Sequence, residues 1–234
     1  MATLVSQAVP AMHWQAAAAM IDHTLLKPDA SREQIEKLCR EAARFDFASV
    51  CVNAYWIPVC AAILRPTPVK VCTVVGFPLG ATLTSAKRFE TVEALRLGAD
   101  EIDMVMNVGA MKSGDHARVE SDIRALSEVT HDAGGLLKVI FENVLLTREE
   151  KIAACELSLA AGADFVKTST GFSSGGATLE DVALMRQRVG NLAGVKAAGG
   201  IRTADQMLAM VAAGADRVGA SASVAICRKL GAPY

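Results

Sequence analysis

Two lysines lie in short apolar segments with no other charge directly beside them. Lys167 follows Phe165 and Val166 in "ADFVKTSTG", and Lys196 lies in "GVKAAGG". If these segments form neighbouring parallel strands, the two amines share a water-poor site, where like charges disfavour each other's ionisation. An amine that stays partly neutral near neutral pH attacks carbonyl carbons. We therefore expect Lys167 to form a Schiff base and Lys196 to supply a neighbouring positive charge.

Asp103 is the candidate third member of this group. It lies in "DEIDMVMN" between Ile102 and Met104, where an unpaired carboxylate would be costly. One interpretation is a structural partner for a cation, and the other is a proton relay that works with a water and the lysines. A single lysine at a strand end is often structural as well, but the second lysine at a matching position favours catalysis.

An anion site is predicted in two glycine-rich segments, "AAGGIRT" and "GASAS", each of which follows a short apolar segment. Glycines expose backbone N–H groups, and the start of a helix adds a positive dipole end. Each segment alone also fits a tight turn, but the loops after strands seven and eight of a (β/α)8 barrel are its usual phosphate cradle. A third Gly/Ser-rich segment, 171–178, either closes over a substrate or is simply flexible. The candidate phosphate-binding residues are Gly171, Gly199, Gly200, Arg202, Gly219 and Ser221.

The elements that must position these residues alternate regularly along the chain. A helix-like run that ends in Gly-Ala-Asp and continues as a short apolar strand occurs in "LGADEIDMV", "AGADFVKTS" and "AGADRVGAS". Glycine suits the left-handed residue that closes a helix, and strands without polar alternation suit a parallel sheet covered on both faces. The pattern predicts strands near 20–25, 48–53, 69–75, 101–106, 136–141, 164–168, 194–198 and 216–219. It predicts helices near 31–44, 55–64, 84–97, 115–132, 147–161, 178–189, 203–213 and 221–230.

This alternation favours an α/β chain folded as a single (β/α)8 TIM barrel over residues 1–234. A doubly wound open sheet is the alternative, but such sheets rarely use eight regular units. Residues 1–18 are expected to form an extra N-terminal helix that covers the bottom of the barrel, and 231–234 to form a short tail. Ser31, Thr84 and Thr178 are predicted N-caps of helices.

The composition argues against several other classes of protein. The chain has 234 residues, 52% of them hydrophobic, and a formal net charge of -1, which indicates one core and neither a nucleic-acid nor a membrane partner. Its 6 cysteines are scattered, as in a cytoplasmic protein with reduced thiols. The 4 histidines are dispersed and no G-x-G-x-x-G follows the first strand, so we expect neither a metal nor a dinucleotide cofactor. Neither a signal peptide nor a membrane-spanning segment is expected.

Seven segments in this order resemble the deoxyribose-phosphate aldolase family of class I aldolases. They are "IDHTLLKP", "VCTVVGFPLG", "EIDMV", "KVIFEN", "FVKTSTGF", "VKAAGGIRT" and "RVGAS". The resemblance covers nearly the whole chain, from about residue 21 to about residue 223. "FVKTSTGF" and "VKAAGGIRT" together are highly specific for the family, and the other segments support them.

The resemblance implies reversible cleavage of 2-deoxy-D-ribose 5-phosphate to D-glyceraldehyde 3-phosphate and acetaldehyde, in deoxyribonucleotide catabolism and without a cofactor. It implies that Lys167 forms the Schiff base, that Lys196 lowers the pKa of Lys167, and that Asp103 relays protons. It also implies a homo-oligomer, either a dimer or a tetramer. The residues that it places around the substrate are Asp22, Thr24 and Thr170.

Two departures from the family pattern concern the ends of the substrate pocket. Some members carry a lysine near the phosphate where this chain has Phe172, so phosphate preference is expected to be weaker or to depend more on Arg202 and the backbone. Some members also end in a tyrosine on a long tail that enters the site, whereas Tyr234 ends only a short "GAPY".

Two other functions stay open from the sequence. The first is another Schiff-base barrel aldolase that acts on a different aldehyde or ketose phosphate, and its substrate profile would reveal it. The second is a catalytically silent protein that binds a phosphorylated sugar on the same fold. Failure of borohydride to trap an adduct with acetaldehyde would favour this second alternative.

Overall fold

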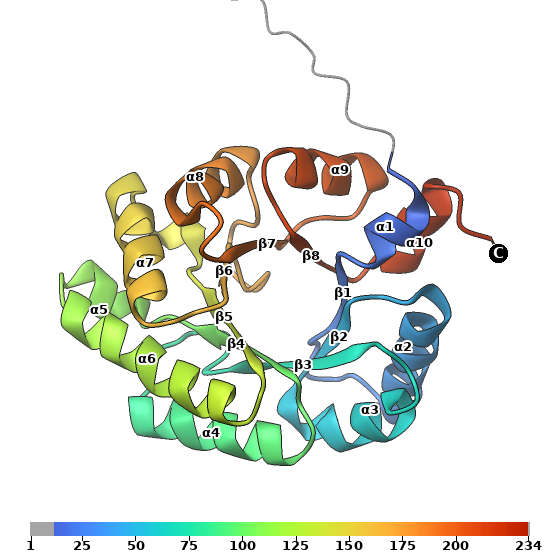
Figure 1. The fold of residues 1–234 in the computed structure, drawn as a ribbon, viewed down its shortest axis with the longest axis horizontal. Helices are drawn as coiled ribbons and strands as arrows, with labels where there is room; N and C mark the ends of the chain where they lie inside the picture. The colour runs from blue at the N-terminus through green and yellow to red at the C-terminus, as the bar shows by residue number, and fades with distance from the viewer. Residues whose placement is uncertain (1–11, 234) are drawn as a thin grey trace, which may run out of the picture.

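Eight parallel strands close into a barrel in the order β1 to β8 in the computed structural model, which describes residues 12–233. Figure 1 shows the helices as a ring around these strands. The predicted TIM barrel is confirmed, and the open-sheet alternative is wrong. The strands are β1 (Ile21–Leu25), β2 (Ser49–Val52), β3 (Lys70–Val75), β4 (Glu101–Val105), β5 (Leu136–Ile140), β6 (Phe165–Lys167), β7 (Gly194–Ala198) and β8 (Arg217–Ala220).

The helices follow the strands at the predicted places. The α-helices are α1 (Trp14–Ala18), α2 (Arg32–Phe45), α3 (Ile57–Leu64), α4 (Thr84–Arg96), α5 (Val108–Lys112), α6 (His116–Asp132), α7 (Arg148–Ala160), α8 (Leu179–Val189), α9 (Ala204–Ala212) and α10 (Ser223–Lys229). Two short 3-10 turns, η1 (Ala54–Trp56) and η2 (Asn143–Leu145), follow β2 and β5. The sequence did not predict α5, which begins where the Asn107 side chain accepts a hydrogen bond from the Ala110 N–H at 3.1 Å.

The repeated Gly-Ala-Asp pattern marks a joint that fixes each strand to its neighbour. Its glycines adopt left-handed φ angles of 107°, 83° and 114° at 98, 162 and 214, which favour glycine. The aspartates at 100, 164 and 216 each accept a backbone N–H of the preceding strand through Oδ2 at 2.8 Å. These contacts satisfy amides at the amino ends of the strands and thereby set the pairing of β3 with β4, β5 with β6, and β7 with β8.

Two of the three predicted helix caps are present. Ser31 forms a capping box with Gln34 at the start of α2, and Thr178 accepts from the Asp181 N–H at the start of α8. Thr84 is not a cap, because Leu83 occupies the N-cap position of α4 and Thr84 is already helical. A hydroxyl residue one position inside the helix thus gave a false cap signal.

The predicted extra N-terminal helix corresponds to α1, which begins at Trp14. It packs against α10, and the Trp14 ring lies edge-on to Phe45 of α2 with 6.1 Å between ring centroids. The remainder of the predicted extension, residues 1–11, and the tail residue Tyr234 lie outside the described residues. Within 12–233, no helix combines the length and the apolar character that crossing a bilayer requires.

Candidate active site

The two lysines singled out in the sequence meet inside the barrel. Lys167 and Lys196 pair in register on β6 and β7. Both residues are buried, with 3% of Lys167 and 1% of Lys196 exposed. Both Nζ atoms donate to the same oxygen, Asp103 Oδ2, at 2.7 Å and 2.6 Å. The structure thus brings together all three predicted catalytic residues, with the carboxylate between the amines rather than beside them.

A second group of buried charges lies below this centre, and the sequence analysis missed it. Lys138 Nζ on β5 donates to Asp103 Oδ1 at 2.9 Å and to Glu101 Oε2 at 2.5 Å. Arg217 on β8 contacts the same Glu101 at 3.0 Å. Lys138 interrupts the apolar run "LLKVI" in the same way that Lys167 interrupts its own strand, so the signal was available.

Asp22, which the sequence analysis places at the substrate, belongs to this lower group of charges. It is not among the residues that line the cavity above the lysines. Its Oδ2 lies 2.5 Å from Lys196 Nζ, and its Oδ1 accepts from Ser49 Oγ at 2.8 Å and from Arg217. It is fully buried. Asp22 is therefore a buried ion-pair partner of Lys196 and not a residue of the cavity wall.

The charges of this network fix the protonation of its members. Burial raises the pKa of Asp103, but the cations of Lys138, Lys167 and Lys196 outweigh it and hold the pKa well below its usual range. Burial lowers the pKa of Lys196, but the carboxylates of Asp103 and Asp22 outweigh it and raise the pKa. Lys196 is therefore predominantly protonated and Asp103 predominantly ionised at neutral pH.

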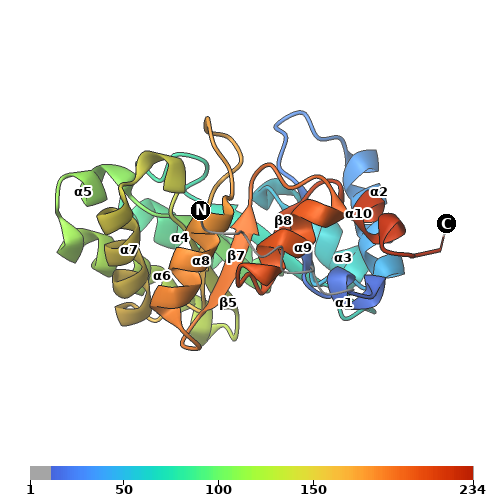
Figure 2. The same cartoon turned by 90° about the horizontal axis from the view of Figure 1, so that it is seen from above.

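A cavity of about 360 Å³ opens above the lysines at the carboxyl ends of the strands. Figure 2 shows the segments after β1 and β6 standing above the barrel on one side, and residues from both line this cavity. Nine of the predicted site residues are in its wall: Thr24, Lys167, Thr170, Gly171, Gly199, Gly200, Arg202, Gly219 and Ser221. The wall residues not predicted are Leu25, Leu26, Lys27, Phe172, Ala198, Ile201 and Ala220.

The glycine-lined end of this cavity brings two loops into contact. A Cβ atom on Gly176 would lie 2.3 Å from the carbonyl oxygen of Gly199, so only glycine permits this approach. The Ala177 N–H donates to that same oxygen at 3.0 Å. The β6–α8 and β7–α9 loops are thereby joined, and Gly199 and Gly200 are held in the cavity wall with left-handed φ angles of 91° and 83°.

Lys27 is a cation of the cavity that sequence reasoning overlooked. It lies two residues beyond the end of β1. The described cations in the cavity wall are Lys27, Lys167 and Arg202. Lys167 is already in contact with Asp103, so Lys27 and Arg202 are the two positive side chains available to an anion there. The position of Lys27 within "IDHTLLKP", just past a predicted strand, is the signal that identifies this residue from the sequence.

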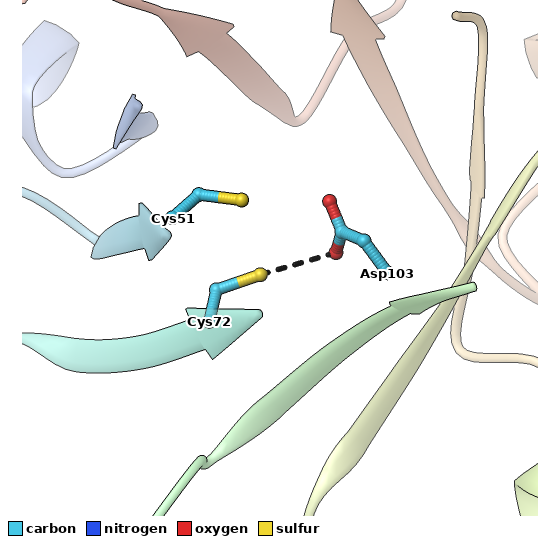
Figure 3. A group of neighbouring side chains, drawn as sticks. All are labelled: Cys51, Cys72 and Asp103. Atoms are coloured by element: carbon cyan, nitrogen blue, oxygen red, sulfur yellow. Dashed lines mark hydrogen bonds between the residues drawn. The ribbon is translucent and has the colours of Figure 1, made fainter. Parts of the chain in front are cut away.

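One group of buried side chains has the spacing of a metal site. It consists of Cys51, Cys72 and Asp103, whose potential ligand atoms lie within 4.8 Å of one another. Figure 3 shows the three side chains turned toward a common point. Cys72 Sγ donates to Asp103 Oδ1 at 3.2 Å. Burial raises the pKa of the Cys72 thiol, and three lysine side chains already contact the carboxylate. This donor set is a poor fit for a cation, which would add to three positive charges.

The fold and the site together define a class of protein. It is a TIM barrel with its candidate site at the carboxyl ends of the strands, where a buried, carboxylate-linked lysine pair lies below a glycine-lined cavity.

A family model described as "DeoC/LacD family aldolase" matches residues 16–230. Among curated proteins, deoxyribose-phosphate aldolases from Brevibacillus brevis and Clostridium perfringens are 58% and 55% identical, over 88% and 92% of this chain and 92% and 96% of their own lengths.

Solved structures agree with these sequence matches. The tetrameric deoxyribose phosphate aldolase from Aeropyrum pernix has a TM-score of 0.87 and 32% identity, and the match covers 92% of this chain and 91% of that one. A structure named as the aldolase QR15 has a TM-score of 0.87 and 40% identity over 91% and 95% of the two chains. The chain therefore belongs to the DeoC/LacD aldolase family.

Proposed function

We propose that this protein is a class I aldolase that cleaves 2-deoxy-D-ribose 5-phosphate reversibly to D-glyceraldehyde 3-phosphate and acetaldehyde. The observation that carries the proposal is the position of Lys167. Its Nζ lies 2.7 Å from Asp103 Oδ2, and the residue lines the same cavity as the paired glycines, Arg202 and Ser221. An aldehyde carbon can therefore reach the amine while the phosphate lies at the glycine-lined end.

The reaction begins with attack of neutral Lys167 Nζ on C1 of the open-chain sugar, and loss of one water gives the iminium. Removal of the proton from the C3 hydroxyl then breaks the C2–C3 bond, and its electron pair moves through C2 to the iminium nitrogen. Glyceraldehyde 3-phosphate leaves with C3 as its new aldehyde. Protonation of the enamine at C2 and addition of one water release acetaldehyde and restore Lys167.

Each partner of Lys167 has a separate role in this scheme. Asp103 accepts the proton of Lys167 or of the C3 hydroxyl, through a water, and returns it to the enamine carbon. Lys196 stays protonated, so its charge favours the neutral form of the adjacent amine and compensates the charge of Asp103. Asp22 holds Lys196 in place. Thr24 and Thr170 contact the sugar hydroxyls.

The phosphate is bound by backbone amides and two cations. Gly171, Gly199, Gly200, Gly219 and Ser221 supply backbone N–H groups or a hydroxyl, and Arg202 and Lys27 supply positive charge. The cavity of about 360 Å³ has both groups of residues in its wall. Because Phe172 contributes no charge, this arrangement makes phosphate affinity depend on the β1–α2 and β7–α9 loops.

The test is trapping of the covalent intermediate. Borohydride reduction in the presence of acetaldehyde should leave an ethyl group on Lys167, which mass spectrometry of the digested protein locates. Peptides that carry Lys138 and Lys196 are internal controls and should stay unmodified, since Lys138 contacts three carboxylates and Lys196 contacts two at 4.0 Å or less. Modification of either one, or of no lysine, contradicts the assignment.

The alternative within the same chemistry is an aldolase for a different aldehyde or ketose phosphate. Wild-type protein that is trapped on Lys167 by acetaldehyde but releases none from deoxyribose 5-phosphate would favour it. We further propose that the chain is one domain over 1–234, works in the cytoplasm in deoxyribonucleotide catabolism, and assembles as a homo-oligomer. The tetramer named for the Aeropyrum pernix structure supports this last proposal.

A further inference from the structure

Two aromatic side chains meet across the mouth of the barrel. Phe77 follows β3 and Phe172 follows β6, and their rings lie edge to face with centroids 5.2 Å apart. Two strands, β4 and β5, separate β3 from β6 on one side of the closed barrel, and four strands separate them on the other. The aromatic pair therefore divides the mouth into a β4–β5 side and a side that includes β7, β8 and β1.

A separate cavity lies on each side of this pair. The cavity of about 360 Å³, with Lys27, Lys167 and Arg202, is on the β7–β8–β1 side. A cavity of about 120 Å³ is on the β4–β5 side, and Thr170 and Phe172 line both. The other residues of the smaller cavity are mainly apolar: Pro78, Leu79, Val108, Glu142, Leu145 and Ser173.

A chain of hydrogen bonds holds Phe172 in this dividing position. Glu142 Oε2 accepts from the Thr170 hydroxyl, and the Phe172 N–H donates to that hydroxyl oxygen at 3.0 Å. Glu142 is 4% exposed, and no ion pair to a cation links it to the described residues. Phe77 is held from below, because it packs on the buried cluster that contains Leu26 and Cys72.

We propose that Phe172 is a specificity-determining residue whose ring closes off the smaller cavity, a latent subsite for the hydrocarbon chain of unphosphorylated aliphatic aldehydes. The ring confines an acceptor aldehyde to the cation-lined cavity, where phosphate is favoured. Removing the ring joins the two cavities and exposes apolar surface to an acceptor chain. Glu142 acts as a positioning residue for the ring through Thr170. This inference rests on the proposed aldolase function.

The experiment compares two acceptors in the synthetic direction, with acetaldehyde as donor. We expect Phe172→Ala to raise the ratio of kcat/KM for hexanal to kcat/KM for glyceraldehyde 3-phosphate about tenfold, the gain from burying roughly two further methylene groups. Phe172 is 52% exposed, so its truncation should leave the fold intact. Phe89→Ala is the matched control, because Phe89 is 69% exposed on α4, and it should leave the ratio unchanged.

Two further variants test the cavity and the positioning residue. Adding Val108→Phe to Phe172→Ala refills the smaller cavity and should return the ratio to the wild-type value. Glu142→Ala should raise the ratio by part of the Phe172→Ala effect. Glu142→Gln keeps an acceptor for Thr170 and should leave the ratio unchanged. A loss of stability alone would lower kcat/KM for hexanal and for glyceraldehyde 3-phosphate together.

An unchanged ratio in Phe172→Ala, or a gain that Val108→Phe leaves in place, overturns the inference. Failure of the proposed function appears elsewhere, in wild-type protein that releases no acetaldehyde from deoxyribose 5-phosphate. The two outcomes are therefore distinguishable.

Discussion

The buried lysine–carboxylate contacts of this protein include two of nearly equal length in different parts of the fold, and only one of these two belongs to the candidate active site. Lys87 Nζ donates to Asp122 Oδ2 at 2.6 Å between α4 and α6, and Lys167 Nζ donates to Asp103 Oδ2 at 2.7 Å inside the barrel. All four side chains are at most 4% exposed. Both lysines are buried and both contact a carboxylate. Neither burial nor contact with a carboxylate is therefore enough to make an amine reactive.

The surroundings of the two lysines make the difference. Lys87 has its own carboxylate and also donates to the Val105 carbonyl at 2.9 Å, so its ammonium group is well satisfied. Lys167 shares Asp103 with Lys138 and Lys196 and lines an open cavity. A carboxylate that serves three cations stabilises each of them less than one that serves a single cation. Competition for the carboxylate and access to substrate are therefore the features that distinguish a reactive lysine.

The largest effect is expected for Lys167→Met. Without the amine no imine forms, so borohydride trapping should disappear and cleavage of deoxyribose 5-phosphate should fall on the order of 10⁴-fold or more. Lys87→Met should still be trapped by acetaldehyde in whatever fraction folds. Both variants are compared by mass spectrometry after reduction. Trapping in Lys167→Met at the wild-type level would show that another lysine is the nucleophile.

Lys87→Met should instead be the variant that loses stability. It leaves Asp122 buried with no ammonium partner, and breaking a buried pair in this way costs about 3–5 kcal/mol. Urea denaturation measures the loss. The double variant Lys87→Met/Asp122→Leu should recover most of it, because an apolar pair of similar volume needs no charge compensation. If Lys87→Met is as stable as wild type, the contact is not the structural counterpart described above.

Lys196→Met tests whether competition for Asp103 matters. Without Lys196, Asp103 contacts two cations instead of three and holds the Lys167 amine more firmly. Attack on the aldehyde should therefore slow, and the rate of borohydride trapping with acetaldehyde at neutral pH should fall about tenfold or more. Lys196→Arg, which keeps the charge, should lose less. An unchanged trapping rate in Lys196→Met would refute the role given to its charge.

The sequence predicted the barrel and the lysine pair because both depend on local pattern. Short apolar segments that alternate with helices imply the parallel sheet, and register between neighbouring strands places Lys167 beside Lys196. The position of Asp103 between the amines depends instead on how β4 reaches across the barrel to β6 and β7. That contact is set by the tilt of the strands, which no local pattern encodes.

Other features were missed for different reasons. Lys138 interrupts an apolar segment as Lys167 does, but it has no polar turn after it, whereas Glu142 looks like an ordinary residue after a strand. Its left-handed φ of 56° and its contact with Thr170 appear only when the β5 and β6 loops meet. The Phe77–Phe172 contact likewise joins segments far apart in the chain.

The smallest effect is expected for Lys27→Met, in the wall of the cavity that Lys167 also lines. Lys27 is exposed, so its contact with a phosphate is partly screened by water, and about a tenfold rise in KM for deoxyribose 5-phosphate is expected. KM for unphosphorylated 2-deoxyribose should not change, because the lost group faces only the phosphate. Lys70→Met, which removes an exposed lysine at the amino end of β3, is the control for net charge. Equal rises for both sugars would mean that Lys27 shapes the cavity instead of binding phosphate.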